Sequence, residues 1–207
     1  MIVLMSAFLL LSAFSCGGGN KANSTSEQSE ETAVNVPQFD ADSAYLYVKN
    51  QVDFGPRVPN TKEHVACGNY LAGQLEAFGA QVTNQYADLI AYDGTLLKAR
   101  NIIGSYKPES KKRIALFAHW DTRPWADNDP DEKNHNTPIL GANDGASGVG
   151  ALLEIARLVN QQQPELGIDI ILLDAEDYGA PQFYTGQHKE EFWCLGSQYW
   201  ARNPHVQ

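Results

Sequence analysis

Five side chains that can bind a metal ion or move a proton stand where apolar segments give way to turns: His119, Asp121, Asp144, Glu176 and Asp177. Segments 114–118 and 168–173 are apolar and strand-like, and the small residues of segment 141–148 precede a helical pattern. In an open α/β sheet, the carboxyl ends of the strands line the crevice where ligands bind. Carboxylates gathered there repel one another unless a cation lies among them. Because zinc binds His nitrogen and carboxylate oxygen, the sequence predicts a mononuclear or dinuclear metalloenzyme.

The individual motifs have both functional and purely structural interpretations. His119 and Asp121 are two residues apart at a strand end, so their side chains point the same way and can share one site, with Asp121 orienting the imidazole. Asp144 can cap the helix that follows it, bind metal, or do both. Glu176 and Asp177 are adjacent and diverge, so one carboxylate can bind metal while the other acts as acid or base. The alternatives are a polar strand end, a simple N-cap and a solvated turn.

Composition and charge narrow the class of protein. The chain has 207 residues, of which 43% are hydrophobic, as expected for a globular domain with a substantial core. Its formal net charge of −10 argues against nucleic acid as a partner, because phosphate binding requires a basic surface. Cys67 and Cys194 do not have metal-ligand spacing, and both a disulfide and two free thiols remain open.

The N-terminal residues indicate export. Residues 2–14 are apolar but too few to span a bilayer comfortably, and they precede Cys16 and a run of glycines. This pattern predicts a lipoprotein signal at residues 1–16 with the lipid on Cys16, a flexible tether at 17–38 and one domain at 39–207. An uncleaved anchor or a plain signal peptide is the alternative. We expect a membrane-tethered protein that faces the periplasm.

Hydrophobic periodicity predicts the elements of the domain. Helices are expected from Asp40–Ser43 onward, after Thr61 until Gly79, and over 146–160; strands are expected at 81–90, 96–103, 113–118 and 168–173. The strand–helix–strand unit 113–173 favours parallel pairing. We therefore predict an α/β fold with a mixed, largely parallel sheet and helices on both faces. The helix near Leu195 meets Pro204 and no strand follows, so we expect a domain that is cut short.

Six motifs in order resemble those of the bacterial, Bacteroidetes-type glutaminyl cyclases, in the superfamily of the zinc aminopeptidases. They are Phe54-Gly55-Pro56-Arg57-Val58-Pro59, Asn101-Ile102-Ile103-Gly104, His119-Trp120-Asp121-Thr122-Arg123, Gly141 to Gly148, Asp174-Ala175-Glu176-Asp177-Tyr178-Gly179 and Gly196-Ser197-Gln198-Tyr199-Trp200. The resemblance runs from about Asp42 to the end of the chain. It implies cyclisation of N-terminal Gln of peptides and proteins to pyroglutamate with release of ammonia, which is an acyl transfer.

Site residues follow by position from the resemblance. It makes Asp144 and Asp177 ligands of one zinc ion and Glu176 the catalytic carboxylate, with His119 and Asp121 in support. The candidates for the walls of the substrate pocket are Trp120, Trp125 and Tyr178. The family's third zinc ligand, a later His, has no match here, so we expect the chain to be a fragment that is inactive by itself.

Two other functions fit parts of the sequence. A zinc aminopeptidase of the same superfamily would use Glu176 as the base that activates a water molecule. A lipoprotein without metal would bind peptides or a partner and catalyse nothing. The remaining histidines lack a metal-site context and are not assigned to metal: His64, His135, His188 and His205.

Overall fold

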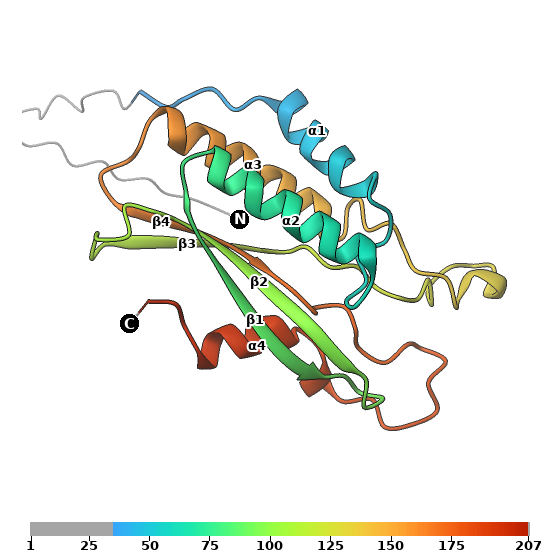
Figure 1. Ribbon diagram of the computed structural model, residues 1–207. Helices are drawn as coiled ribbons and strands as arrows, with labels where there is room; N and C mark the ends of the chain where they lie inside the picture. Colours follow the sequence, from blue (N-terminus) through green and yellow to red (C-terminus); the bar gives the residue numbers. More distant parts are fainter. Residues whose placement is uncertain (1–34, 207) are drawn as a thin grey trace, which may run out of the picture. The chain divides into compact units, whose positions relative to one another are not determined.

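A computed structural model describes residues 35–206, and residues 36–206 belong to one compact unit. Its helices and strands lie close to the predicted ranges (Figure 1). In chain order they are α1 (Ala41–Val52), α2 (Lys62–Ala77), β1 (Gln81–Ile90), β2 (Leu96–Tyr106), β3 (Arg113–His119), α3 (Ala146–Gln161), β4 (Gly167–Leu173) and α4 (Leu195–Arg202). Short 3-10 helices cover Glu132–Asn134 and Glu190–Phe192.

The four described strands form one mixed sheet in the order β1-β2-β4-β3. β3 and β4 are parallel and adjacent, with α3 as their crossover, as predicted from the strand–helix–strand pattern. β1 and β2 form an antiparallel hairpin, and β2 is antiparallel to β4. Two of the three pairings among the described strands are therefore antiparallel. The mixed sheet is confirmed, but a parallel majority is not seen in this part, because the short turn after β1 forces the hairpin.

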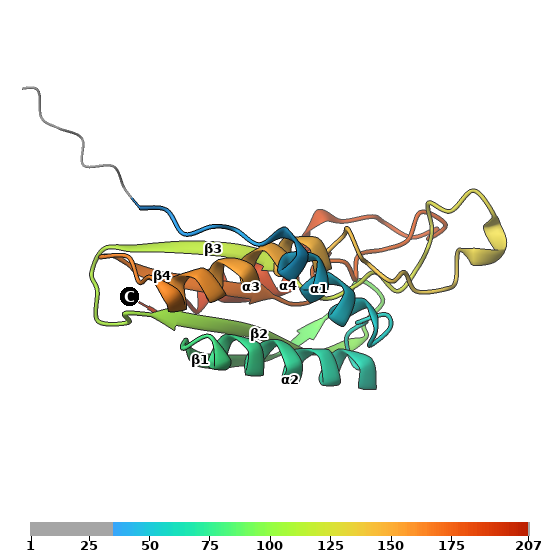
Figure 2. The ribbon, with the colours of Figure 1, turned by 90° about the horizontal axis from the view of Figure 1, so that it is seen from above.

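Helices cover both faces of the sheet, as predicted (Figure 1). α2 packs on β1 and β2, α3 packs on β3 and β4, and α1 packs against α3 (Figure 2). α4 lies on the other face, against β1 and β2. Side chains of β4 alternate between two cores: Ile170 and Leu172 belong to the core under α1–α3, whereas Ile171 and Leu173 pack toward Trp200 of α4. Burial on both sides explains the continuous apolar run of β4.

Local capping signals place the first two helices. Asp40 caps α1 by accepting from the backbone N–H groups of Asp42 and Ser43. Thr61 caps α2 by accepting from the N–H of His64, and Gly79, with φ of +79°, follows its end.

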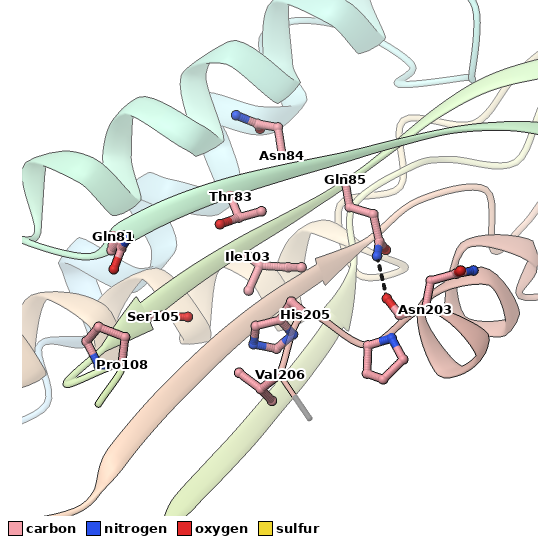
Figure 3. A pocket seen from close by; sticks show the side chains of 11 residues that line it. Gln81, Thr83, Asn84, Gln85, Ile103, Ser105, Pro108, Asn203, His205 and Val206 are labelled. Carbon is pink, nitrogen blue, oxygen red and sulfur yellow. Dashed lines mark hydrogen bonds between the residues drawn. The ribbon is translucent and has the colours of Figure 1, made fainter. Parts of the chain in front are cut away.

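A cavity of about 450 Å³ lies between the β1–β2 hairpin and the segment after α4 (Figure 3). Gln85 donates to the Asn203 carbonyl oxygen at 2.7 Å, and His205 is one of the lining residues. Ser105, in its lining, pairs with Asp169, whereas His119 pairs with Leu173 at the other end of β4. This cavity is therefore separate from the strand ends at which the candidate site lies.

The predicted signal, tether and lipid-bearing Cys16 fall largely or wholly outside the described residues. Among the described helices, none is long and apolar enough to cross a membrane. Cys67 and Cys194 are both free thiols in the structure.

Replacing Leu71 of α2 by Ala is expected to lower the free energy of unfolding by about 2–5 kcal/mol, because its fully buried side chain would leave a cavity. Val65→Ala on the same helix is the matched control. Val65 is 56% exposed, so a change of about 0.5 kcal/mol or less is expected. Denaturant unfolding measures both, and equal losses would contradict the placement of Leu71 in the core.

Candidate metal centre

Three predicted site residues from different segments converge at the carboxyl ends of β3 and β4. His119, Asp144 and Asp177 each offer one ligand atom, and these atoms all lie within 4.8 Å of one another. Nε2 of His119 lies 3.0 Å from Oδ1 of Asp144. The parallel register that pairs His119 with Leu173 brings the two strand ends together, and the loop before α3 supplies Asp144.

The start of α3 leaves the Asp144 carboxylate available for this group. The N-cap is Gly145, with φ of +88°, and no side chain caps the helix, so the alternative of Asp144 as the N-cap is not the one that the structure shows. A Cβ at position 145 would lie 3.0 Å from the Asp121 carbonyl oxygen and 3.2 Å from Cε1 of His119. Glycine therefore allows both the left-handed backbone and the close approach of His119. The side chain of Asp144 is 57% exposed and faces His119.

A sharp turn after β4 aims Glu176 and Asp177. Ala175 has φ of +52°, which is uncommon for a residue with a side chain. The start of α4 holds this turn through its backbone: the N–H groups of Cys194, Leu195 and Gly196 donate to the carbonyl oxygens of Glu176, Ala175 and Asp174 at 3.0–3.1 Å. The position of the two carboxylates therefore depends on α4 as well as on β4.

Asp121 connects this turn to the end of β3. Its fully buried carboxylate accepts the backbone N–H groups of Glu176 at 3.1 Å and Asp177 at 3.2 Å. Nδ1 of His119 lies 3.6 Å from Oδ1 of Asp121, longer than a normal hydrogen bond. The structure thus brings Asp121 beside His119, as the spacing predicted. It also shows the contact of Asp121 with the backbone of Glu176 and Asp177, which the sequence did not predict.

The electrostatics of the cluster reflect burial and crowding of acids. Burial, together with the charges of Asp121 and Asp144, raises the pKa of Asp177 to about 6. Burial also raises the pKa of Glu176, with His119 opposing the shift. For His119, burial works to lower the pKa, but Asp121 and the nearby carboxylates raise it to about 9. The positive charge near Glu176 and Asp177 is therefore too small to offset burial and the repulsion between the acids.

The donor set fits a metal ion. Oδ2 of Asp177 and Nδ1 of His119 are buried and have no hydrogen-bond partner within the described part of the chain. One imidazole and two carboxylates are the ligand types that zinc takes in catalytic sites. A bound cation would also relieve the repulsion that raises the pKa of Asp177. Glu176 is not in the group of ligand atoms, so its carboxylate stays available for proton transfer.

The predicted wall residues separate into two environments. Trp125 and Asp144 line one cavity of about 250 Å³, and Tyr178 packs edge-on against Trp125 at 5.3 Å between ring centroids. Trp120 instead lies in the core, fully buried, with its ring stacked on His64 at 4.3 Å. Trp120 does not line the cavity of Trp125 and Asp144, because alternation along the strand end points it away from its neighbours His119 and Asp121.

Three residues that organise the site were not assigned from the sequence. His64 lies 2.9 Å from both oxygens of the buried Asp174 at the start of the sharp turn. Arg123 pairs with Asp127 and donates to the Asp177 carbonyl oxygen at 3.1 Å. Arg57 binds loop carbonyls near the metal ligands. An Arg between prolines and an Asp that ends an apolar strand are weak signals, because their partners lie far away in the sequence.

The fold is a mixed α/β sheet, and the group of donor atoms lies at its strand ends, where ligands bind in folds of this class. Residues 101–207 match the model of Peptidase family M28, more than half of the chain, and the chain belongs to this family.

Solved structures agree with this assignment. A glutaminyl cyclase from Bacteroides thetaiotaomicron, crystallised with N-acetylhistamine, is 94% identical with a TM-score of 0.83, over 84% of this chain and 59% of its own. A protein described as a leucine aminopeptidase precursor from the same species is also 94% identical with a TM-score of 0.83, over 84% of this chain and 60% of its own. A zinc-dependent exopeptidase from Parabacteroides distasonis is 64% identical with a TM-score of 0.82, over 83% of this chain and 59% of its own. The chain thus spans about three fifths of the length of these relatives.

Replacing Asp121 by Asn is expected to lower the free energy of unfolding by about 1–3 kcal/mol, because the amide can accept only one of the two backbone N–H groups. Asp88→Asn removes an exposed ion pair with Lys98 on the β1–β2 hairpin and is the matched control, with an expected change of about 0–1 kcal/mol. Denaturant unfolding of the two variants measures the difference. A loss no larger for Asp121→Asn than for Asp88→Asn would contradict the bridging role.

Proposed function

We propose that the complete gene product is a zinc-dependent glutaminyl cyclase, an acyltransferase that converts N-terminal Gln of peptides and proteins to pyroglutamate and releases ammonia. One observation carries the proposal: Glu176 stands beside the His119, Asp144 and Asp177 group in a chain 94% identical to a glutaminyl cyclase. The identity supports the activity, and the donor group supports the metal.

Asp144 and Asp177 would hold the zinc ion through two carboxylate oxygens. A nitrogen of His119, expected from the sequence only as a supporting residue, lies within reach of the same ion. Bound zinc supplies a Lewis acid that polarises the side-chain amide carbonyl of the substrate Gln. Asp121 holds the backbone of Asp177 and lies beside His119, so it keeps both side chains in place.

Glu176 would carry the proton. The α-amino nitrogen of the substrate attacks the side-chain amide carbon, the ring C–N bond forms, and the bond to the amide nitrogen breaks. Glu176 takes a proton from the α-amine and delivers one to the leaving nitrogen, which departs as ammonia. Burial, which raises the pKa of Glu176, helps the carboxyl group to hold this proton between the two steps. Because the attack is intramolecular, much of the catalysis is the holding of a folded chain end, for which Trp125 and Tyr178 offer an apolar surface.

An aminopeptidase is the second candidate. The 94% identical protein described as a leucine aminopeptidase precursor favours it. The same Glu176 would then activate water. Purified protein tested on Gln-arylamide and Leu-arylamide separates the two, because a cyclase releases ammonia from the first and leaves the second intact.

Replacing Glu176 by Gln is expected to lower kcat for cyclisation by about 10²–10⁴-fold while zinc content stays the same, because the variant keeps the donor group but loses the proton carrier. Glu190→Gln, at an exposed carboxylate in the 3-10 helix Glu190–Phe192, is the matched control and should keep full activity. A chelator should abolish the activity of the unmodified protein, and added zinc should restore it. Activity that survives complete removal of metal would rule out the zinc mechanism.

We further propose that the protein is exported and held by lipid on Cys16 at a membrane surface facing the periplasm. The apolar residues 2–14 before Cys16 and the polar residues after it support this. Cys16→Ser is expected to abolish incorporation of labelled fatty acid and to release the protein from the membrane fraction, whereas Cys194→Ser should change neither. Labelling that persists in the Cys16→Ser variant would contradict the anchor.

A further inference from the structure

Arg57 is a buried cation whose partners are backbone carbonyls. Its side chain is fully buried, and within residues 35–206 no ion pair joins it to a carboxylate. Nε donates to the Trp120 carbonyl oxygen at 3.0 Å, Nη1 to that of Leu140 at 2.8 Å, and Nη2 to that of Gly141 at 2.9 Å. Nη1 also reaches the Gly55 oxygen at 3.4 Å. Burial of an ionised group is costly, and these bonds offset the cost.

The carbonyls belong to the two segments that present His119 and Asp144. Trp120 directly follows His119, and the backbone carbonyl of Arg57 accepts the N–H of Thr122 at 3.2 Å, so Arg57 holds the end of β3 from two sides. On the other segment, the Gly141 oxygen accepts from both Arg57 and the N–H of Ala146, the first residue of α3.

The backbone of Gly141 is shaped to admit the guanidinium. Its φ is +56°, and a Cβ there would lie 3.0 Å from Nη2 of Arg57 and 2.5 Å from Cγ2 of Thr122. Any larger residue would push the loop away from Arg57 and from the end of β3. The same backbone conformation at Gly141 therefore accommodates the Arg57 side chain and directs the loop toward Asp144.

We propose that Arg57 is a positioning residue of the metal centre: it fixes the distance between the end of β3, which carries His119, and the loop that carries Asp144. This inference rests on the proposed zinc site. The planar guanidinium reaches both segments at once because its donors form a rigid fork, whereas a Lys ammonium is a single point and cannot span them. Burial lowers the pKa of Arg57, and Cys67 and Asp121 oppose the shift.

The test compares zinc affinity in variants of the complete gene product. Arg57→Lys is expected to weaken zinc binding by about 10- to 100-fold and to alter the visible absorption of the cobalt-substituted protein, because the ligands lose their fixed separation. Arg113→Lys is the matched control. Arg113 begins β3, at the end opposite to His119. Its side chain is 13% exposed, pairs with Asp169 and donates to the Tyr106 carbonyl oxygen. Its substitution removes a comparable clamp without touching the site, so zinc affinity should not change.

All affinities are measured with the metal alone, by competition with a chromophoric chelator, below the unfolding transition of each variant. Unchanged zinc affinity in Arg57→Lys would overturn the proposal, and so would an equal loss in Arg113→Lys, which would indicate a general effect on stability. If Arg57→Lys does not fold, Arg57→Gln and Arg113→Gln replace the pair, since Gln removes the buried charge but keeps a donor. Failure of the unmodified protein to bind zinc or cobalt would instead contradict the proposed function itself.

Discussion

The candidate site depends on one backbone constraint, the left-handed turn at Ala175. A residue with a Cβ in this region costs about 1–2 kcal/mol, so the surrounding structure must hold it there. Asp174 begins the turn with a fully buried carboxylate that accepts from His64 at 2.9 Å and from the backbone N–H of Arg100 at 2.6 Å. The first backbone N–H groups of α4 bind the carbonyl oxygens of the same turn. Because these contacts come from α2, β2 and α4, the direction of Glu176 is set by the whole domain.

The site combines several acidic side chains with one imidazole and two nearby arginines. His119 lies among these acids, and its pKa rises to about 9 because Asp121 and the nearby carboxylates oppose the effect of burial. Arg57 and Arg123 bind backbone carbonyls of the loops and leave the side-chain oxygens of Asp144 and Asp177 to other partners. A guanidinium group bound to those oxygens would occupy the positions that a metal ion requires. The arrangement therefore keeps the loops rigid and the ligands available.

Local signals in the sequence were sufficient for the elements of the fold, and long-range contacts explain what they missed. The caps Asp40 and Thr61 act on residues two or three positions away, so a short segment reveals them. His64 and Asp174 are 110 residues apart, and no local sequence pattern predicts that they form a pair. The alternation that correctly placed His119 and Asp121 on one side also places Trp120 on the other, where its indole N–H donates to the Arg100 carbonyl oxygen at 3.1 Å. Resemblance among motifs does not carry that geometric information.

The parallel pairing of β3 with β4 explains why so few residues can build the site. Antiparallel strands end at opposite edges of a sheet, whereas parallel neighbours end at the same edge and direct their next residues into one crevice. The crossover through α3 adds the third segment, because the connection leaves β3 at that same edge. Asp121 then joins the two strand ends by accepting the backbone N–H groups of Glu176 and Asp177. The candidate metal ligands, the proton carrier Glu176 and the bridging residue Asp121 thus all come from the strand–helix–strand unit of β3, α3 and β4. The β1–β2 hairpin and α4 pack against this unit and stabilise it.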